Sequence, residues 1–537
     1  MDKVVSRIAR LNEIGIALSA EKDAKLICDR ILHGAMELTN CDGGSMYEMS
    51  EDKKELTFVI VSTHSLNINM GGSSGVEINF PPVQLYVDDK PNMINVVSSA
   101  VHDDTTINIP DVYHAEGFDF TGTRKFDEST GYRTQSILTI PMKDHQGDII
   151  GVLQLINAQD AAGNTEEFSA EDQQIAQSLA SQAAVAITNN RLIEEQRILF
   201  ESFIKLIAGA IDAKSPYTGG HCKRVPELTL LIAKACSEQN YGIFKDFNMS
   251  EKDIYELKIA GWLHDCGKVT TPEYVVDKST KLETIYDRIN TVDYRFEVLK
   301  RQATIEMLEE KLARLSQDKN ADCSDLEKTL AEKHVSIDSD REFVRTSNIG
   351  GEFMSEELVQ RIKDIGSIRW TNPDGEEVNF FDDNEIENLT IARGTLTEAE
   401  RQVINGHMTM TIQMLSELPF PKHLKNVPEY AGGHHERMDG KGYPNGLTRD
   451  QMSIPARVMG VADIFEALSA SDRPYKKGKT LTECMKILGF MKKDNHVDPD
   501  IFDVFVKEKL YMKYAEEFLP DNQIDEVDQS KIPGYEP

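Results

Sequence analysis

The spacing of hydrophobic residues in roughly the first 190 positions predicts a single α/β domain. We expect an amphipathic helix at about 21–38, and CDGGSMYEMS after it should be a turn that enters a strand. Further strand-like runs lie at 56–62, 136–142 and 147–158. Residues 63–130 are rich in Asn, Asp, Ser and Gly, which predicts loops and short elements lying over a pocket.

A second pattern, an apolar stripe with helical period, begins after Ser169 and continues for about 45 residues. It predicts a connector helix at about 172–212 whose middle neither flanking domain can cover. We expect this helix to pair with its copy in a homodimer. The alternative is two helices with a break near Asn189–Asn190. The apolar positions are Ile175, Leu179, Ala183, Ala186, Ile193, Phe200, Phe203, Ile207 and Ile211.

From about 200 to 515 the pattern is mainly helical, and about 280–395 reads as an insertion. Heptad-like leucines around the turn QDKNADCSD predict an antiparallel helical hairpin, which we expect to project into solvent and to serve partner contact or substrate gating. RWTNPDGEEVNFF predicts a small β-hairpin. The acidic segment 516–537 contains proline and is expected to be loose.

These patterns together predict a multidomain α+β protein. Its parts are an N-terminal α/β domain at 1–190, the connector helix at 172–212, an all-α domain at 200–515 with the inserted hairpin, and the acidic tail. A chain of 537 residues is too long for one ordinary core, which agrees with this division.

Composition narrows the functional classes. The formal charge of −31 argues against binding to nucleic acid or to an anionic membrane surface, and an anionic substrate would need a local positive site such as metal ions. No run approaches the roughly 18 apolar residues that a membrane span needs. The seven cysteines are odd in number and form no C-x-x-C pair, so we expect reduced thiols and a cytoplasmic location.

Histidines and aspartates on or next to apolar helical segments are the strongest chemical signal. In GWLHDCGKV, for example, the dyad His264–Asp265 follows an apolar helical segment. Buried His and Asp side chains are costly unless they are paired or bind a metal, so several that point inward predict a divalent metal site. Taken singly, each has an ordinary interpretation, such as a hydrogen-bonded helix histidine or a capping aspartate. The candidate ligands are His221, His264, Asp265, His407, His434, His435 and Asp463.

The order of these residues, with Lys268 after the dyad and GYP after the histidine pair, resembles the HD-GYP domain phosphodiesterases of the HD superfamily. The matching stretches are SPYTGGHCKRV, LHDCGK, LTEAERQVINGH, HHERMDGKGYPNGL, IPARVMGVADIFEAL and DRPYK. The resemblance covers about 200–515 apart from the insertion. It implies metal-dependent hydrolysis of cyclic di-GMP, a bacterial second messenger in signalling, to pGpG, GMP or both.

The resemblance also implies roles for single residues. Asp265 and Lys268 would be catalytic, and Lys268 is expected one helical turn beyond His264, facing the same cleft. The first metal ion would be held by His221, His264, Asp265 and Asp463. The second would be held by His407, His434 and His435, with Asp265 bridging. Substrate contacts would come from Lys268, Tyr443, Arg473 and Lys476.

Family members described as trinuclear carry a glutamate four residues before the first histidine, where Tyr217 stands in this chain. The resemblance therefore implies a binuclear site with two divalent transition-metal ions. Iron or manganese is the family habit, while zinc or another first-row metal suits the same nitrogen and oxygen ligands.

The N-terminal domain resembles a GAF sensor domain in DGGSMYEM, LTIPMKDHQGDIIGVLQLINA and FSAEDQQIAQSLASQAAVAITNN. GAF domains bind small molecules, and the ligand here is unknown. Members that bind cyclic nucleotides carry a signature that Asn157, Phe168 and Asp172 match. Ala158 and Gln173 depart from it, so the sequence does not assign a cyclic nucleotide to this domain.

Three functions stay open at this point. The first is a GAF-regulated cyclic di-GMP phosphodiesterase. The second keeps the chemistry and changes the substrate to cyclic GMP-AMP or a linear dinucleotide. The third is a non-catalytic cyclic-dinucleotide sensor or scaffold, which the inserted hairpin would suit as a partner surface. Cys222 and Cys266 flank candidate ligands and are interpreted as packing residues, with redox sensitivity as the alternative.

Overall fold

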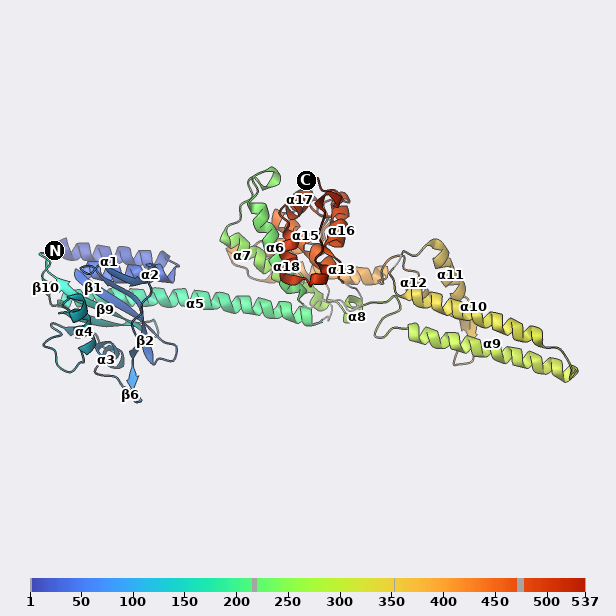
Figure 1. The fold of residues 1–537 in the computed structure, drawn as a ribbon, viewed down its shortest axis with the longest axis horizontal. Helices are drawn as coiled ribbons and strands as arrows, with labels where there is room; N and C mark the ends of the chain where they lie inside the picture. The colour runs from blue at the N-terminus through green and yellow to red at the C-terminus, as the bar shows by residue number, and fades with distance from the viewer. Residues whose placement is uncertain (1, 215–219, 352, 471–477, 537) are drawn as a thin grey trace. The chain divides into compact units, whose positions relative to one another are not determined.

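The structure is a computed structural model that describes residues 2–214, 220–351, 353–470 and 478–536 (Figure 1). The chain divides into two compact units, Met1–Leu199 and Phe200–Pro537. Tyr217, Arg473 and Lys476, named above from the sequence, lie outside the described residues. Within the described ranges, no helix is long and apolar enough to cross a membrane.

The first unit is built on an antiparallel sheet with strand order β3-β2-β1-β9-β8-β7, to which β4 and β10 add at β2 and β9. Its strands are β1 Cys41–Met49, β2 Glu55–Thr63, β3 Ile68–Gly71, β4 Val83–Gln84, β7 Ile107–Ile109, β8 Ile137–Lys143, β9 Ile149–Gln159 and β10 Thr165–Glu166. β5 Tyr86–Val87 and β6 Lys90–Pro91 form a separate two-stranded ribbon.

Helices cover both faces of this sheet (Figure 1). The helices are α1 Asp2–Ala20, α2 Ala24–Thr39, α3 Val96–His102, α4 Thr121–Thr130 and α5 Ala170–Lys214. On one face, Leu18 of α1, Ile31 of α2 and Leu179 of α5 pack against Met46 and Leu153 of the sheet. Smaller apolar clusters with α3 cover the other face.

Two predictions from the sequence concern this unit and the helix that leaves it. The segment CDGGSMYEMS was expected to begin as a turn, and that expectation is wrong, because the strand β1 already starts at Cys41. A Cβ atom on Gly44 would lie 2.8 Å from the carbonyl oxygen of Gln154, so the missing side chain lets β1 and β9 pair closely. The long stripe forms one helix, α5, which runs continuously through Asn189–Asn190.

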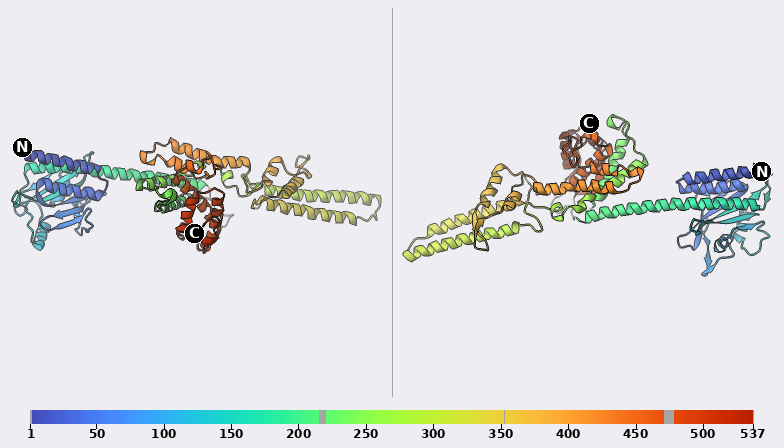
Figure 2. Two further views of the ribbon diagram at one scale, coloured as in Figure 1. Left: turned by 90° about the horizontal axis from the view of Figure 1, so that it is seen from above. Right: turned by 180° about the vertical axis from the view of Figure 1, so that it is seen from behind.

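The second unit is mainly helical (Figure 2). Around its main core lie α6 His221–Ser237, α7 Glu251–Leu263, α8 Glu273–Val276, α13 Glu398–Glu417, α14 Val427–Gly432, α15 Ile454–Ser469, α16 Leu481–Lys493, α17 Pro499–Lys507 and α18 Leu510–Phe518. This core also includes Ile204 and Ile211 from the last turns of α5. Short 3-10 turns complete it, of which η2 Cys266–Thr270 matters for the site.

The end of α5 is tied to two segments that carry candidate ligands. Lys214, its last residue, donates from Nζ to the carbonyl oxygens of Val269 at 2.5 Å and Thr271 at 2.6 Å. Oδ2 of Asp212 accepts a hydrogen bond from the backbone N–H of Gly220 at 3.1 Å. Gly220 directly precedes α6, so α5 contacts both η2 and the start of α6.

The insertion has an apolar core of its own. It consists of α9 Ile289–Gln317, α10 Ser324–Asn348, α11 Glu356–Gly366, β11 Arg369–Thr371, β12 Glu377–Asn379 and α12 Asp383–Leu389. Phe296 and Leu299 of α9 meet Val344 of α10 and the buried pair Phe380–Phe381. α9 and α10 form the antiparallel hairpin and RWTNPDGEEVNFF forms the small β-hairpin, as the sequence indicates (Figure 1).

Two buried lysines close the base of the insertion. Lys278 donates to both carboxylate oxygens of Glu400, at 2.9 and 2.8 Å, and to Oδ1 of Asn388 at 2.7 Å. Lys281 donates to the carbonyl oxygens of Leu389 at 3.0 Å and Ile391 at 2.8 Å. The points where the insertion leaves and rejoins the domain are therefore held together.

The C-terminal segment differs from its sequence expectation. It was expected to be loose, but Ile532 is buried in the main core and Gln523 is buried beside α15. Nε2 of Gln523 donates to the carbonyl oxygens of Ser469 and Lys479, both at 2.8 Å. These few buried side chains dock the segment onto the domain. The acidic composition of the segment gave no sign of them.

Candidate metal centre

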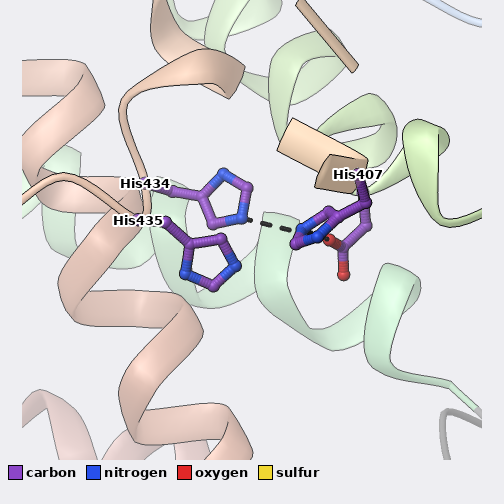
Figure 3. A group of neighbouring side chains, drawn as sticks. His407, His434 and His435 are labelled. Atoms are coloured by element: carbon purple, nitrogen blue, oxygen red, sulfur yellow. Dashed lines mark ion pairs between the residues drawn. The ribbon is translucent and has the colours of Figure 1, made fainter. Parts of the chain in front are cut away.

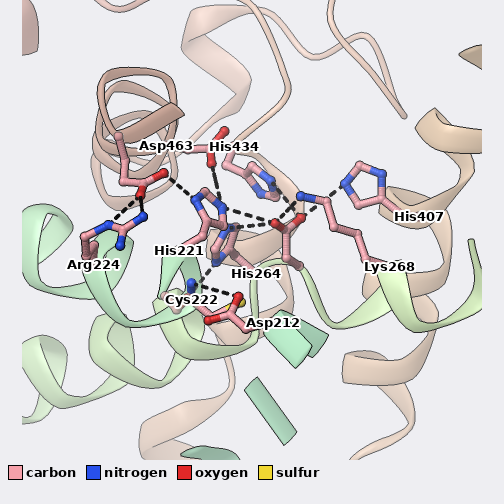
Figure 4. Close-up of polar contacts among 12 residues, drawn as sticks. Asp212, His221, Cys222, Arg224, His264, Lys268, His407, His434 and Asp463 are labelled. Carbon is pink, nitrogen blue, oxygen red and sulfur yellow. Dashed lines mark hydrogen bonds and ion pairs between the residues drawn. The ribbon is translucent and has the colours of Figure 1, made fainter. Parts of the chain in front are cut away.

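The seven candidate ligands come from five helices or helix ends and meet in one place. Figure 4 labels His221, His264, His407, His434 and Asp463, and Figure 3 labels His435. His221 is the first residue of α6, and His264–Asp265 follow directly after α7. His407 lies within α13, the pair His434–His435 follows α14, and Asp463 lies within α15. Six of the seven are buried, and His435 is half-buried.

Asp265 lies between two groups of histidines and aims one carboxylate oxygen at each. Its Oδ2 is 3.3 Å from Nε2 of His221 and 3.3 Å from Nε2 of His264. Its Oδ1 is 3.3 Å from Nε2 of His407 and 4.0 Å from Nε2 of His434. Oδ1 of Asp463 adds to the first group, 3.3 Å from Nε2 of His221. The ligand atoms therefore form two clusters that share Asp265.

Three histidines have the same tautomer, which backbone hydrogen bonds impose. Nδ1 faces the carbonyl oxygen three residues earlier in His264 (Gly261, 2.7 Å), in His434 (Ala431, 2.6 Å) and in His407 (Ile404). A carbonyl oxygen only accepts, so Nδ1 carries the proton and Nε2 presents its lone pair to the centre. This is the usual arrangement of a metal-binding histidine.

Buried atoms without hydrogen bonds test whether a metal fits. Among the described residues, Oδ1 of Asp265 and Nε2 of His407 and of His434 are buried and lack a hydrogen-bond partner. All three are lone-pair donors that face one another, as the convergence of the histidines in Figure 3 shows. Buried acceptors in this arrangement are costly unless a cation lies between them. The residues therefore fit a cation with nitrogen and oxygen ligands.

The electrostatics of the centre suit ionised carboxylates and differ between its imidazoles. Burial disfavours the charge of His221, but Glu466, Asp265 and Asp463 outweigh it and raise the pKa of this imidazole. Burial favours the neutral acid, but Lys268 and His264 outweigh it and hold the pKa of Asp265 well below its usual range. His221 does the same for the pKa of Asp463. Burial lowers the pKa of His435 to about 4, so this imidazole is neutral at pH 7 and able to bind a metal.

Lys268 reaches the centre by a different route from the one expected. It was expected on the same helix as His264, and that expectation is wrong, because α7 ends at Leu263 and Lys268 lies in the 3-10 turn η2. Its Nζ is 2.5 Å from Oδ2 of Asp265. Burial disfavours its charge, but the Asp265 carboxylate outweighs this and raises the pKa of Lys268. The centre thus has a fixed ammonium beside the shared carboxylate.

The loop after the histidine pair folds back over it. The ring of Tyr443 stacks on His435 with 4.8 Å between centroids and 22° between planes. Buried Glu436 accepts from the backbone N–H groups of Asn445 at 2.8 Å and Leu447 at 2.9 Å. A Cβ atom on Gly442 would lie 2.4 Å from Cα of Glu436, so only glycine allows this close return. Tyr443 therefore supports a candidate ligand as well as facing the site.

Sequence reasoning missed three residues that organise the centre: Glu436, Glu466 and Arg224. Glu466 is buried, lies three residues after Asp463 on α15, and binds Nδ1 of His221 and the guanidinium of Arg224. The i+3 spacing on one helix was the available signal, since it places Glu466 on the same face as Asp463. Arg224 stands in the same relation to His221 on α6.

Cys222 and Cys266 lie beside this site as packing residues. Both thiols are buried, and burial raises the pKa of Cys266 to about 11 and that of Cys222 further. Such thiols are largely protonated at neutral pH and therefore poor nucleophiles.

The residues of the cyclic-nucleotide signature in the N-terminal domain make structural contacts. Oδ1 of Asn157 accepts from the backbone N–H of Gln135 at 2.6 Å, and Phe168 is buried in the core. Asp172 caps the start of α5 through Ser169 and forms an ion pair with Arg7 of α1. These contacts explain the three residues without a ligand.

Comparison with known proteins identifies both domains. The GAF domain family matches residues 23–187, and the HD domain family matches residues 384–501. The chain therefore carries a GAF domain followed by an HD domain. The HD match includes His407, His434, His435 and Asp463, while His221, His264 and Asp265 lie before it.

Three relatives are each 38% identical over the matched stretch. They are 3'3'-cGAMP-specific phosphodiesterases 1 and 3 of Vibrio cholerae serotype O1 and a cyclic di-GMP phosphodiesterase of Pseudomonas aeruginosa. The matches cover 21%, 24% and 21% of this chain and 26%, 25% and 26% of the relatives. The chain thus spans about a quarter of the length of these relatives.

Proposed function

We propose that this protein is a metal-dependent phosphodiesterase that hydrolyses cyclic di-GMP to pGpG, GMP or both, under the control of its GAF domain. The observation that carries the proposal is the shared carboxylate of Asp265, whose two oxygens face two separate histidine groups. Asp265 could therefore contribute to the binding of two cations, one with each histidine group, and sites that hold two metal ions support the hydrolysis of phosphodiesters. The named activities of the relatives support the same reaction class.

Two divalent transition-metal ions would be held by the two ligand groups. His221, His264 and Asp463 would hold one, His407, His434 and His435 the other, and Asp265 both. When bound, such ions activate water at neutral pH and neutralise phosphate oxygens. The nitrogen-rich ligand set suits iron or manganese and also zinc.

The residues of the chain supply orientation and charge. Lys268 places an ammonium 2.5 Å from the bridging carboxylate, where it can neutralise a phosphate oxygen as charge develops. It also provides a local positive charge in a chain whose formal charge is −31. Tyr443 stands over His435 at the edge of the centre, and Arg473 and Lys476 are further proposed phosphate contacts.

Cyclic GMP-AMP is the second candidate substrate, because two of the relatives are named for it. The two cyclic dinucleotides share the phosphodiester ring and differ in one base, so the metal centre treats them alike. Discrimination then depends on base contacts outside the ligand set. A sensor or scaffold without turnover is disfavoured, because such a protein has no need for a complete ligand set and Lys268.

The proposed assembly is a homodimer joined along α5. Ile193, Leu199, Phe203 and Leu206 are large apolar side chains that are 65%, 57%, 55% and 67% exposed on this helix. Exposed apolar residues at helical spacing are typical of a helix that pairs with a second copy. Two further expectations are separate from the dimer. One is a small-molecule ligand of the GAF domain, and the other is a protein partner of the insertion.

Turnover by the metal-loaded protein tests the proposal. Cyclic di-GMP and cyclic GMP-AMP are assayed side by side, with pGpG and GMP separated by chromatography and bound metal measured on the same sample. We expect Asp265→Asn to lose more than about 100-fold in kcat, because the bridge loses its charge. The matched control is Asp450→Asn, which changes an exposed carboxylate to the same amide. Full activity of Asp265→Asn with normal metal content would refute the assignment.

A further inference from the structure

The outer face of α9 carries a row of exposed apolar side chains that nothing in the proposed function uses. They are Tyr294, Val298, Ile305, Leu308 and Leu312, which are 75%, 41%, 55%, 48% and 65% exposed. The opposite face of the same helix is already occupied, since Phe296 and Leu299 are buried in the core of the insertion. The row therefore cannot be explained by packing within the hairpin.

The spacing of the row is that of a coiled-coil seam. Val298, Ile305 and Leu312 are separated by seven residues, and Tyr294 and Leu308 occupy the second apolar position of the same heptads, with Arg301 between them. From Tyr294 to Leu312 the row is about 27 Å long at 1.5 Å per residue. A seam of this length and spacing fits a partner helix that lies along α9.

The seam is complementary to itself when a second α9 runs in the opposite direction. An antiparallel register with its two-fold axis at the middle of the row places Val298 opposite Leu308 of the second copy and Leu312 opposite Tyr294. Ile305 then lies opposite Arg301, whose long stem can cover it. Tyr294, Val298, Leu308 and Leu312 thus meet one another across the two-fold axis, as an isologous contact requires, and Ile305 meets Arg301.

Charge supports this register. The same alignment brings Glu297 of one copy beside Lys311 of the other, twice in the dimer because of the two-fold axis. Within one chain Glu297 pairs with Arg301 at 3.0 Å and Lys311 pairs with Glu327 at 2.6 Å. A parallel in-register pair would instead place Glu297 beside Gln302 of the second copy, which carries no charge.

We infer that α9 forms an antiparallel contact with α9 of a second copy of this chain, in the register that pairs Val298 with Leu308. The inference goes beyond the proposed function and does not depend on it. The partner of the insertion is then the insertion of a second copy. In the resulting arrangement of four helices, α10 of each copy lies on the outside.

Disulfide cross-linking between engineered cysteines in the full-length chain tests the register directly. The seven native cysteines are all buried and free, so background cross-linking should be low. Under mild oxidation we expect Val298→Cys/Leu308→Cys to form a covalent dimer in high yield. Val298→Cys alone and the register control Val298→Cys/Leu312→Cys should cross-link at least ten-fold more slowly. Residues 298 and 308 of one chain are about 15 Å apart along the helix, so they cannot bridge internally.

Three further variants test the chemistry of the contact. Leu312→Glu in the double-cysteine chain should reduce the cross-linking rate by at least ten-fold, because it puts a charge opposite Tyr294. Glu297→Lys should slow it at low salt, and the charge swap Glu297→Lys/Lys311→Glu should restore it. Leu312 is exposed and Glu297 and Lys311 are half-buried, so circular dichroism checks that each variant keeps the fold. Efficient cross-linking of Val298→Cys alone would show a parallel contact, and equal slow rates for all variants would show that α9 is unpaired. Either result overturns the inference.

Discussion

Nδ1 of His221 lies 2.5 Å from Oε2 of Glu466, and Oε1 of the same carboxylate accepts a hydrogen bond from Arg224 at 2.7 Å. Because the carboxylate accepts at Nδ1, Nε2 of His221 turns toward Asp265 and Asp463. In the described ligands His264, His407 and His434, Nδ1 instead contacts a backbone carbonyl oxygen, so His221 differs from them in being held by a charged side chain.

Glu466→Ala should weaken metal binding about 10- to 100-fold, the usual effect of removing a carboxylate behind a metal-binding histidine. Glu466→Gln should weaken it less, since the amide oxygen still accepts from Nδ1 but carries no charge. Chelator competition with Zn²⁺ or Mn²⁺ measures the affinity without relying on turnover. Arg224→Lys is the control, because it keeps a cation beside an intact Glu466. Unchanged affinity in Glu466→Ala would remove this role.

Lys268→Met should lower kcat for cyclic dinucleotide hydrolysis by about 100-fold or more, because the ammonium no longer neutralises developing phosphate charge. Bound metal should stay the same or rise, since the Asp265 carboxylate loses its competing cation. Lys268→Arg keeps the charge and should recover part of the rate. Steady-state kinetics with elemental analysis of each variant separates these effects. A fully active Lys268→Met would show that the lysine only supports the fold.

The outer half of the hairpin should be dispensable for the metal centre. Replacing residues 305–332 with a short Gly-Ser turn leaves Phe296, Leu299 and Val344 in the core of the insertion, together with the lysines at its base. We expect unchanged metal content and at most a few degrees of change in Tm. The variant should also lose the α9 contact. If the shortened chain folds but loses both metals, the hairpin belongs to the site.

Lys281 should make stability depend on pH above 8. Burial lowers the pKa of Lys281 from 10.5 to about 8, so between these values the unfolded chain binds a proton that the folded chain lacks. The contribution of Lys281 to the free energy of unfolding therefore rises as pH increases through this window, by roughly 2–3 kcal/mol at full effect. Below this window the contribution of Lys281 does not change with pH. Below pH 8 the folded chain holds a charged, desolvated ammonium.

The comparison between wild type and Lys281→Met isolates this contribution. Denaturant unfolding of both proteins at pH 7.5, 8.5 and 9.5 should show a stability difference that grows with pH in favour of wild type. Titration of tyrosines and other lysines affects both chains and cancels. A difference independent of pH would mean that Lys281 keeps its ordinary pKa in the folded state.

Dimerisation through α5 is testable when the α9 contact has been removed. In the shortened-hairpin background, light scattering should give twice the chain mass. Ile193→Glu/Leu199→Glu should give a monomer, because charges replace exposed apolar residues in the seam. Glu195→Gln is the matched control on the exposed surface of the same helix. A monomer before any change to α5 would contradict the expected pairing.

The sequence predicts the main elements and the ligand types because both depend on local patterns. The 45-residue stripe of α5 and the heptads of α9 are periodic over many turns, which few alternatives share. His264 and Asp265 are notable because charged residues directly follow an apolar segment. In each case the signal lies within a few residues of the feature that it predicts.

Features that depend on contacts between residues far apart in the sequence cannot be predicted from such local patterns. Glu466 reads as an ordinary helix residue until α6 brings His221 to it, 245 positions away in the sequence. The strand position of Gly43–Gly44 depends on pairing with β9, and DGG alone favours a turn. The C-terminal segment is held by Gln523 and Ile532, whose burial depends on surfaces formed by earlier parts of the chain.

The last turn of α5 has a mechanical consequence. Its Lys214 and Asp212 are bonded to the backbone on both sides of the centre, at Val269 and Thr271 after Lys268 and at Gly220 before His221. A twist or an axial shift of this turn would pull on both segments at once, while His407 and the pair His434–His435 are carried by other helices. Movement of the helix end would thus shift the segments that carry His221 and Asp265 relative to the ligands on other helices, among them Asp463 on α15. A regulator that moved this turn would change the spacing of the ligands, and with it the rate of turnover.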